Sequence, residues 1–345
     1  MKIESFDFSK NKETYIVAEL SANHNQDIKT AINTIKAAKE IGCNAVKIQT
    51  YTPDTITIDC DKKDFLIKGT IWGGDSLYSL YKKAYTPWEW HKELFDFAKK
   101  IGITLFSTPF DKSSVDFLEK LNTPAYKIAS FEITDIPLIK YIAQKNKPII
   151  LSTGIAEKQD IDLAVSTILD QGNDKIILLQ CTSSYPSPLD QANLKLIDQL
   201  KNDYNVVTGL SDHTLGYLCP VIAVSLGARF IEKHFILDKT LGGPDSSFSL
   251  DKNEFKIMIE NIRNTEKALG EPSYSLTKKQ IEGKYFSRSL YIVKDVKKGD
   301  LVTTENIKSI RPGYGLHPKH YDQVLNKNFT KDLDKGTRLS FKLIN

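Results

Sequence analysis

Short apolar runs alternate with longer amphipathic stretches along residues 1–270. Several of these runs are almost continuously apolar, as strands buried on both faces of a sheet are. Eight of them recur along the chain: Tyr15–Ala18, Ala45–Ile48, Thr104–Phe106, Ala125–Ile128, Pro148–Leu151, Ile176–Leu179, Val206–Leu210 and Arg229–Ile231. The pattern therefore predicts eight strands separated by helices.

The stretches between the runs carry helix signals. Asp27 precedes a stretch in which Ile28 and Ile35 share one face, so we expect it to be an N-cap. Asp251 and Glu254 have the spacing of a capping box before the last predicted helix of this part. Glycine follows three predicted helices just before a strand begins, at Gly42, Gly102 and Gly227.

Eight strand–helix units in about 270 residues are typical of an α/β fold of the (β/α)8 TIM-barrel type. A doubly wound open sheet is the alternative, and it is disfavoured because no glycine-rich dinucleotide turn follows the first strand. The connection from Thr52 to Pro87 is too long for a plain unit and predicts a short hairpin or lid beside the barrel mouth.

The pattern changes after residue 270. Residues 271–284 form a polar segment, interpreted as a linker, and residues 285–345 contain short β-type runs separated by Lys-Gly turns. We therefore expect a barrel domain over 1–270, a linker over 271–284 and a small β-rich domain over 285–345. A domain of about 60 residues is marginal alone, so we expect it to dock on another surface.

The chain has 345 residues, 41% of them hydrophobic, and a net charge of +4 that is unevenly distributed. Residues 281–345 hold 13 Lys and Arg against 7 Asp and Glu, which suits an anionic ligand or a solvated surface.

No basic run with interleaved aromatic residues occurs, so nucleic acid is not a predicted partner. No apolar run of about 18 residues occurs, so no membrane span is expected. The chain has four cysteines, which show neither C-x-x-C spacing nor a disulfide-rich pattern: Cys43, Cys60, Cys181 and Cys219. A cytoplasmic location is therefore expected.

Every predicted strand ends in polar side chains, which a purely structural barrel does not require. In a parallel barrel these ends meet at the carboxyl-terminal mouth. The residues concerned are Glu19, Lys47, Gln49, Thr108, Lys127, Ser130, Glu132, Ser152, Thr153, Thr182–Tyr185, Ser211, His213, Glu232 and His234. Lys47 and Lys127 lie within apolar runs, where an unpaired ammonium group costs several kcal/mol. Together with the hydroxyls they predict a site for a small anion that carries phosphate or carboxylate.

His213 and His234 stand at the ends of consecutive strands. A strand–helix–strand connection returns both ends to the same face, so the two imidazoles can converge on one metal ion. A hydrogen-bonded structural role for each histidine is the alternative.

Lys127 could instead act as the nucleophile of a Schiff-base aldolase on the same barrel. Lys233 is a poor candidate, because strand alternation directs it away from Glu232 and His234. The absence of a G-x-x-x-x-G-K-[ST] loop argues against a nucleotide substrate.

A set of motifs in order along the chain resembles the sialic acid synthases, also called nonulosonate synthases. The segments are A-E-L-S-A-N-H-N, V-K-I-Q-T-Y, F-S-T-P-F, Y-K-I-A-S-F-E, L-S-T-G, C-T-S-S-Y-P, G-L-S-D-H-T-L-G and I-E-K-H-F. The final segment resembles that family's antifreeze-like (SAF) domain. The resemblance covers essentially the whole chain, and it implies an enzyme that condenses phosphoenolpyruvate with an N-acylated amino sugar by a carbon–carbon bond-forming transfer.

The resemblance also implies roles for individual residues. His213 and His234 would bind a divalent ion, manganese in this family. Phosphoenolpyruvate would be held by Lys47, Thr108, Lys127, Ser130, Ser152 and Ser211, and Gln49 would support the metal side. The sugar would be bound, or protons moved, by Glu19, Glu132, Tyr185 and Asp245. Arg311 would come from the SAF domain of a partner subunit in a domain-swapped homodimer.

Two departures from the neuraminate-type pattern bear on the substrate. Ser183 stands where such members have asparagine, and Ser246 stands where a G-P-D-H type sequence has histidine. The segments Y-T-P-D-T-I-T, I-K-G-T-I-W and T-P-W-E-W-H resemble the branch of the family that forms pseudaminic acid. That branch uses 2,4-diacetamido-2,4,6-trideoxy-L-altrose, whose terminal methyl group would suit an apolar wall made by Phe248 or by aromatic residues of the Thr52–Pro87 segment.

Three alternatives remain at this point. A neuraminate or legionaminate synthase would use N-acetylmannosamine or a related sugar, and a Schiff-base lyase would use Lys127. A sugar- or ice-binding module, suggested by the antifreeze-like segment, would need neither a metal nor a polar group on every strand.

Overall fold

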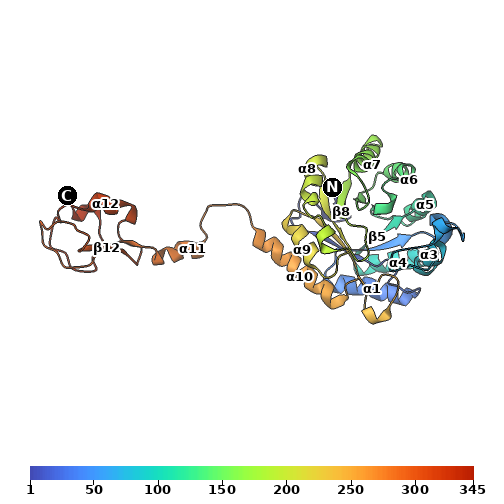
Figure 1. The fold of residues 1–345 in the computed structure, drawn as a ribbon, viewed down its shortest axis with the longest axis horizontal. Coiled ribbons are helices and arrows are strands. Elements are labelled where there is room, and N and C mark those ends of the chain that lie inside the picture. Colours follow the sequence, from blue (N-terminus) through green and yellow to red (C-terminus); the bar gives the residue numbers. More distant parts are fainter. The chain divides into compact units, whose positions relative to one another are not determined.

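The computed structural model describes residues 1–345 and divides into two compact units, Met1–Gly270 and Glu271–Asn345 (Figure 1). Each unit has a hydrophobic core of its own. No helix is both long and apolar enough to cross a membrane.

The first unit is a closed barrel of eight parallel strands surrounded by helices, which confirms the predicted fold (Figure 1). The strands are β3 (Tyr15–Glu19), β4 (Ala45–Thr50), β5 (Thr104–Pro109), β6 (Tyr126–Ile128), β7 (Ile149–Ser152), β8 (Ile176–Cys181), β9 (Val207–Asp212) and β10 (Phe230–His234). Each strand pairs with the next along the chain, and β10 closes the barrel against β3.

A helix follows each strand and leads the chain back towards the start of the next strand. These helices are α1 (Ile28–Ile41), α4 (Trp88–Ile101), α5 (Lys112–Lys120), α6 (Ile136–Ala143), α7 (Lys158–Asp170), α8 (Leu196–Tyr204), α9 (Leu218–Ser225) and α10 (Lys252–Leu269). Asp27 caps α1 by accepting from the amides of Lys29 and Thr30, and Asp251 forms a capping box with Glu254, both as predicted.

Several strands run further than the apolar pattern predicts. Glu19, Asp212 and His234 are the last residues of their strands, although the apolar runs before them stop one to three residues earlier. The backbone ladder of a parallel sheet does not depend on side-chain polarity, so strands continue into the polar residues. The polar side chains at the mouth are therefore held by the sheet rather than by loops.

An N-terminal hairpin covers the amino-terminal end of the barrel, and the sequence pattern did not predict it. Its strands are β1 (Lys2–Ile3) and β2 (Phe6–Asp7), each two residues long. Phe6 and Phe8 contact Tyr15 at the start of β3, with ring centres 4.9 and 5.7 Å away. The hairpin closes the end opposite the polar mouth, so it contributes to the core and not to the site.

The connection from Thr52 to Pro87 contains α2 (Pro53–Ile56), a 3₁₀ turn at Lys63–Phe65 and α3 (Leu77–Ala84). An antiparallel bridge between Leu66 and Ser76 makes the predicted hairpin, which is thereby confirmed. We call residues 66–76 the lid hairpin. The side-chain amide of Gln26 donates to the Tyr85 carbonyl over 2.6 Å, which fixes the end of the segment against the loop after β3.

The second unit is small and rich in β-structure. Its regular elements are α11 (Lys278–Gly283), β11 (Ser289–Ile292), β12 (Ile307–Ile310) and α12 (Tyr321–Val324), with β11 and β12 antiparallel. Its core gathers Leu290, Ile292, Val302, Ile307 and Phe329. Helix α11 lies inside the polar segment interpreted as a linker, where Thr277 and Gln280 form a capping box.

Short 3₁₀ turns complete the regular structure of both units. They are Ser130–Glu132, Leu189–Gln191, Lys239–Leu241, Lys284–Phe286, Pro318–His320 and Phe341–Leu343.

One close approach between strands yields a prediction about stability. A Cβ atom added to Gly209 in β9 would lie 2.0 Å from the carbonyl oxygen of Phe230 in β10. Because backbone in the barrel wall cannot yield easily, Gly209→Ala should destabilise the first unit by about 3 kcal/mol or more. Urea denaturation measures this loss of unfolding free energy.

Gly73→Ala is the matched control, because its added Cβ would lie 3.2 Å from the carbonyl oxygen of Thr70 in an exposed turn. We expect a loss of about 0.5 kcal/mol or less there. Equal losses for the two variants would contradict the argument from the strand contact.

Candidate active site

Four buried charges meet at the carboxyl ends of the strands. The ammonium group of Lys47 lies 2.9 Å from Glu19 Oε2 and 3.4 Å from Glu232 Oε1. Lys127 Nζ lies 3.3 Å from the same Glu232 oxygen. All four residues are at most 4% exposed, so the charges are removed from water and compensate each other. We call this group the charge cluster.

Polar neighbours extend the charge cluster. Lys47 donates to Thr108 Oγ1 over 3.2 Å, and Ser211 donates to Glu232 Oε1 over 3.3 Å. The amide of Gln49 donates to Glu19 Oε1 over 3.0 Å. Gln49 therefore orients a carboxylate of the cluster, and the structure gives it no contact with the histidines.

Burial and neighbouring charges act against each other on the pKa values of the cluster. Burial lowers the pKa of Lys127, although Glu232 opposes that shift. Burial would also lower the pKa of Lys47, but Glu19 and Glu232 outweigh it and raise the pKa. Burial would raise the pKa of Glu232, but Lys127 and Lys47 lower it. The ionised state of each group thus depends on the others.

His213 and His234 come together, with ring centres 5.4 Å apart. His213 Nδ1 lies 3.0 Å from the Thr182 carbonyl, which can only accept, so Nδ1 carries a proton, and in the neutral imidazole Nε2 carries the lone pair. His234 Nδ1 is buried without a hydrogen-bond partner, and the nearest carboxylate oxygen, Asp245 Oδ2, is 3.8 Å away. No group of three or more histidine, cysteine or acidic side chains is arranged to hold a metal ion.

Tyr185 and Asp245 both lie beside the histidines. The ring centre of Tyr185 is 4.3 Å from that of His213 and 6.4 Å from that of His234. Burial raises the pKa of both acids, well above the usual value for Tyr185. The Tyr185 hydroxyl therefore keeps its proton and can donate a hydrogen bond, whereas burial makes the Asp245 carboxyl a weaker acid than an exposed aspartate.

The predicted serines lie on the neighbouring strand ends. Ser130 Oγ accepts from the amide of Gly154 over 3.0 Å, and a Cβ on Gly154 would lie 2.3 Å from Ser183 Oγ. Ser130 and Ser183 thus flank one backbone position where no side chain fits. Ser152 Oγ is buried without a partner, which leaves it available to a bound group.

Glu132 lies just after a barrel strand, whereas Arg311 lies in the second unit. Glu132 follows β6, its Oε2 is buried without a partner, and burial raises its pKa to about 7, while Lys127 opposes that shift. Arg311 is exposed and belongs to the second unit.

Glu232 and Ser21 had no predicted role in the chemistry of the site, although Glu232 was placed at the mouth. Glu232 contacts both lysines, and it lies two residues before His234 along β10, on the same face of the strand. Ser21 accepts from Gln49 over 3.0 Å and carried no comparable sequence signal. Asp212 forms an ion pair with buried Lys233, which agrees with the prediction that Lys233 does not join the groups at the mouth.

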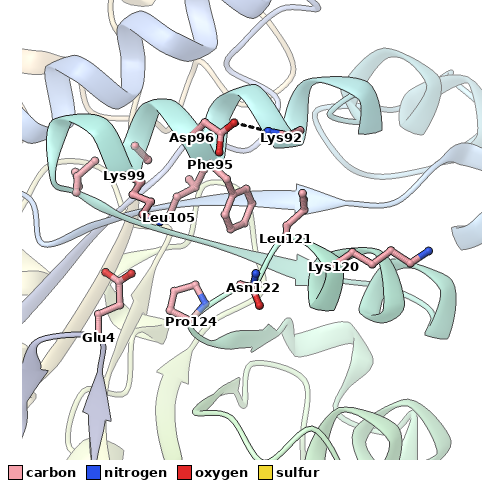
Figure 2. A pocket seen from close by; sticks show the side chains of 12 residues that line it. Glu4, Lys92, Phe95, Asp96, Lys99, Leu105, Lys120, Leu121, Asn122 and Pro124 are labelled. Atoms are coloured by element: carbon pink, nitrogen blue, oxygen red, sulfur yellow. Dashed lines mark hydrogen bonds and ion pairs between the residues drawn. The ribbon is translucent and has the colours of Figure 1, made fainter.

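The first unit also has a groove away from the charge cluster. It has a volume of about 340 Å³ and is lined by residues of α4, by the end of α5 and by residues that precede or begin β5 and β6 (Figure 2). Ile103 and Pro124 precede their strands, which puts the groove towards the amino-terminal end of the barrel. Figure 2 shows Lys92 paired with Asp96 at its edge, over 2.6 Å. Nothing in the groove connects it to the charge cluster.

Comparison with known families agrees with the geometry at the mouth. A model of the NeuB family matches residues 34–274. This range includes both histidines and every member of the charge cluster except Glu19. A model of the SAF domain matches residues 287–344. The chain belongs to the NeuB family. The resemblance to the sialic acid synthases stated from the motifs is thereby confirmed.

Among NeuB family relatives, the pseudaminic acid synthase of Campylobacter jejuni strain 81-176 is 48% identical over 332 residues, covering 96% of this chain and 97% of the relative. The pseudaminic acid synthase of Helicobacter pylori is 49% identical and covers 94% and 96%. A solved structure of N-acetylneuraminic acid (sialic acid) synthetase from Leptospira borgpetersenii has a TM-score of 0.71 at 31% identity, covering 79% of this chain and 90% of that one.

The raised pKa of Glu132 predicts a pH-dependent stability. An unfolded glutamate titrates near 4.3 and the folded one at about 7, so the folded state holds a proton that the unfolded state has lost between these values. The stability that this protonation contributes is present below about pH 4.3 and is lost as the pH rises through 7.

Glu132→Gln removes this titration. We expect the difference in unfolding free energy between Glu132→Gln and the unmodified chain to increase by up to about 3 kcal/mol between pH 5 and pH 7. Above pH 7 this difference should level off. Urea denaturation at pH 5, 6, 7 and 8 measures the difference. A difference that does not change with pH would contradict the assigned pKa.

Proposed function

We propose that this chain is a pseudaminic acid synthase, which condenses phosphoenolpyruvate with 2,4-diacetamido-2,4,6-trideoxy-L-altrose to give pseudaminic acid and phosphate. The observation that carries the substrate assignment is the identity of 48–49%, over nearly the full length, to enzymes of that name. The two buried lysines at the mouth support an anionic co-substrate independently.

In this reaction the enol carbon of phosphoenolpyruvate attacks the open-chain aldehyde of the sugar. Water adds to the resulting cation, and phosphate leaves by C–O cleavage. Lys47 and Lys127 neutralise the charge of phosphoenolpyruvate in a dry environment, where electrostatic attraction is stronger than in water. The hydroxyl groups that would complete its binding are those of Thr108, Ser130, Ser152, Ser183 and Ser211.

We propose His213 and His234 as the ligands of a divalent ion, with manganese as the ion that the family resemblance implies. Two observations fit this role: the Thr182 carbonyl fixes the His213 tautomer with a free Nε2, and buried His234 Nδ1 lacks a partner. When bound, the ion would supply a Lewis acid that polarises the aldehyde of the sugar.

Four acids surround this arrangement and would bind the sugar or move protons. Tyr185 and Asp245 stand beside the histidines, Glu19 belongs to the charge cluster, and Glu132 has a pKa of about 7. A group with a pKa near neutrality is suited to proton transfer in either direction. We assign Glu132 that role and assign Gln49 the positioning of Glu19.

We further propose a domain-swapped homodimer in which Arg311 of one subunit reaches the barrel mouth of the other. The support is the net positive charge of residues 281–345 and the exposure of Arg311. We place the enzyme in the cytoplasm, because all four cysteines are free, as thiols in a reducing compartment are.

A Schiff-base lyase is the second candidate, and the lowered pKa of Lys127 is the observation that favours it. Borohydride treatment in the presence of the substrates separates the two reactions, because only the lyase gives a covalent lysine adduct. The engagement of Lys127 with Glu232 favours an anion-binding role instead.

The metal assignment predicts sensitivity to chelation. Excess chelator should abolish phosphate release from phosphoenolpyruvate, and added Mn²⁺ should restore it. His213→Ala and His234→Ala should each reduce the rate by about 100-fold or more while the protein stays folded, because the Lewis acid contributes several kcal/mol to the transition state. A colorimetric phosphate assay measures the rate, and full activity in excess chelator would rule out this assignment.

The substrate assignment predicts selectivity between sugars. We expect kcat/KM for the trideoxy-altrose to exceed that for N-acetylmannosamine by at least about tenfold, because a buried hydroxyl without a partner costs about 1–3 kcal/mol. Competition between the two sugars, analysed by mass spectrometry, measures the ratio. Comparable use of both sugars would move the assignment to a neuraminate or legionaminate synthase.

A further inference from the structure

A tryptophan from the lid hairpin reaches the barrel mouth. Trp72 lies near the tip of this hairpin, and its ring centre is 5.5 Å from that of Tyr185, with the planes at 51°. Its indole N–H donates to the Pro244 carbonyl over 3.0 Å. Pro244 precedes Asp245, whose carboxylate lies beside His234, so the indole is tied to the loop that carries this acid.

Trp72 continues a set of rings that encloses the histidine pair. Tyr185 contacts His213 and also Phe248, with ring centres 4.3 and 5.4 Å apart. Phe248 contacts His234 in turn, at 4.9 Å. We call Trp72, Tyr185 and Phe248 the aromatic wall. Trp72 is the member of the wall without a ring contact to either histidine, and it comes from the long loop between β4 and α4.

Packing within the lid does not explain the position of this indole. The neighbouring apolar side chains Ile58, Leu66 and Ile71 are 59%, 41% and 50% exposed, so the hairpin has no core that Trp72 could fill. Trp72 itself is half-buried, and its ring contact and its hydrogen bond both go to the mouth. An aromatic ring directed from an exposed hairpin to a polar site is typical of a contact with ligand.

We propose that Trp72 is the specificity-determining residue of the sugar site, where its indole covers the methyl end of the sugar. The inference rests on the proposed function and names the side chain that produces the selectivity. An apolar ring gains contact with a methyl group, whereas a hydroxylated carbon chain at the same place loses its water without a new hydrogen bond. The wall therefore favours the deoxy sugar over N-acetylmannosamine.

The test compares kcat/KM for the two sugars in full-length Trp72→Ala and Trp72→Gln. Trp72→Ala removes the ring, so the preference for the deoxy sugar should fall by about tenfold or more, with KM for phosphoenolpyruvate unchanged. Trp72→Gln adds hydrogen-bonding groups at the same position and should also raise the use of N-acetylmannosamine above that of the unmodified enzyme. Both changes lie in an exposed hairpin, so the barrel should remain folded, as circular dichroism would verify.

Trp88→Phe is the matched control. The indole of Trp88 also donates to a backbone carbonyl, that of Tyr51 over 3.1 Å, but its ring stacks on Phe117 and contacts no member of the aromatic wall. This variant loses an equivalent hydrogen bond outside the wall, and its ratio for the two sugars should stay within about twofold of the unmodified value.

Two results would overturn the inference, and they are distinguishable from failure of the proposed function. If the unmodified enzyme prefers the deoxy sugar and Trp72→Ala keeps that preference, Trp72 does not select the sugar and the proposed function stands. If Trp72→Ala lowers kcat/KM equally for both sugars, the indole only holds the lid hairpin in place. If the unmodified enzyme shows no preference for the deoxy sugar, the proposed function fails together with the inference.

Discussion

The mutual compensation of buried charges at the barrel mouth is the constraint on which the site depends. Taking an ammonium or carboxylate group out of water costs several kcal/mol, and removing one partner of a buried pair costs about 3–5 kcal/mol. The barrel meets this constraint through register: Glu19 is paired with Lys47 across β3 and β4, and Glu232 with Ser211 across β10 and β9. The charge cluster is thus built by strands, which hold side chains more rigidly than loops do.

Glu232 is the centre of this arrangement because one of its oxygens contacts both lysines. Its other oxygen, Oε2, is buried without a partner. A carboxylate in that position keeps both ammonium groups close together and charged in the absence of substrate. An anion that enters the mouth then meets two ammonium groups whose desolvation has already occurred, which reduces the cost of binding, but it shares them with the carboxylates of Glu19 and Glu232.

The sequence allowed the barrel and most mouth residues to be predicted, because each depends on local pattern. Apolar runs mark the strands, and in parallel strands the residues that follow them must meet at one end. The partners within the site could not be predicted in the same way. That Glu232 rather than Asp212 joins the lysines follows from alternation along β10 and from the pairing of Asp212 with Lys233, which requires the three-dimensional register.

Irregular segments were the least predictable. The N-terminal hairpin has strands of two residues, too short to show an alternating pattern. The lid hairpin could be expected from its length, but the place of its tip is set by a contact with Pro244, which is distant in the sequence. Such contacts carry no periodic signal, so the sequence suggested a wall of Phe248 or aromatic residues of the Thr52–Pro87 segment, and the structure showed that Trp72 is the residue of that segment that contacts Tyr185.

The central claim is that the charge cluster binds the anionic substrate. Isothermal titration of the full-length protein with phosphoenolpyruvate, comparing the unmodified chain with Lys127→Met, tests it directly. Lys99→Met, which changes an exposed lysine in the groove of Figure 2, is the matched control. The account predicts a Kd at least about 30-fold weaker for Lys127→Met, from the loss of about 2 kcal/mol or more, and no change for Lys99→Met. An unchanged Kd in a folded Lys127→Met variant would contradict it.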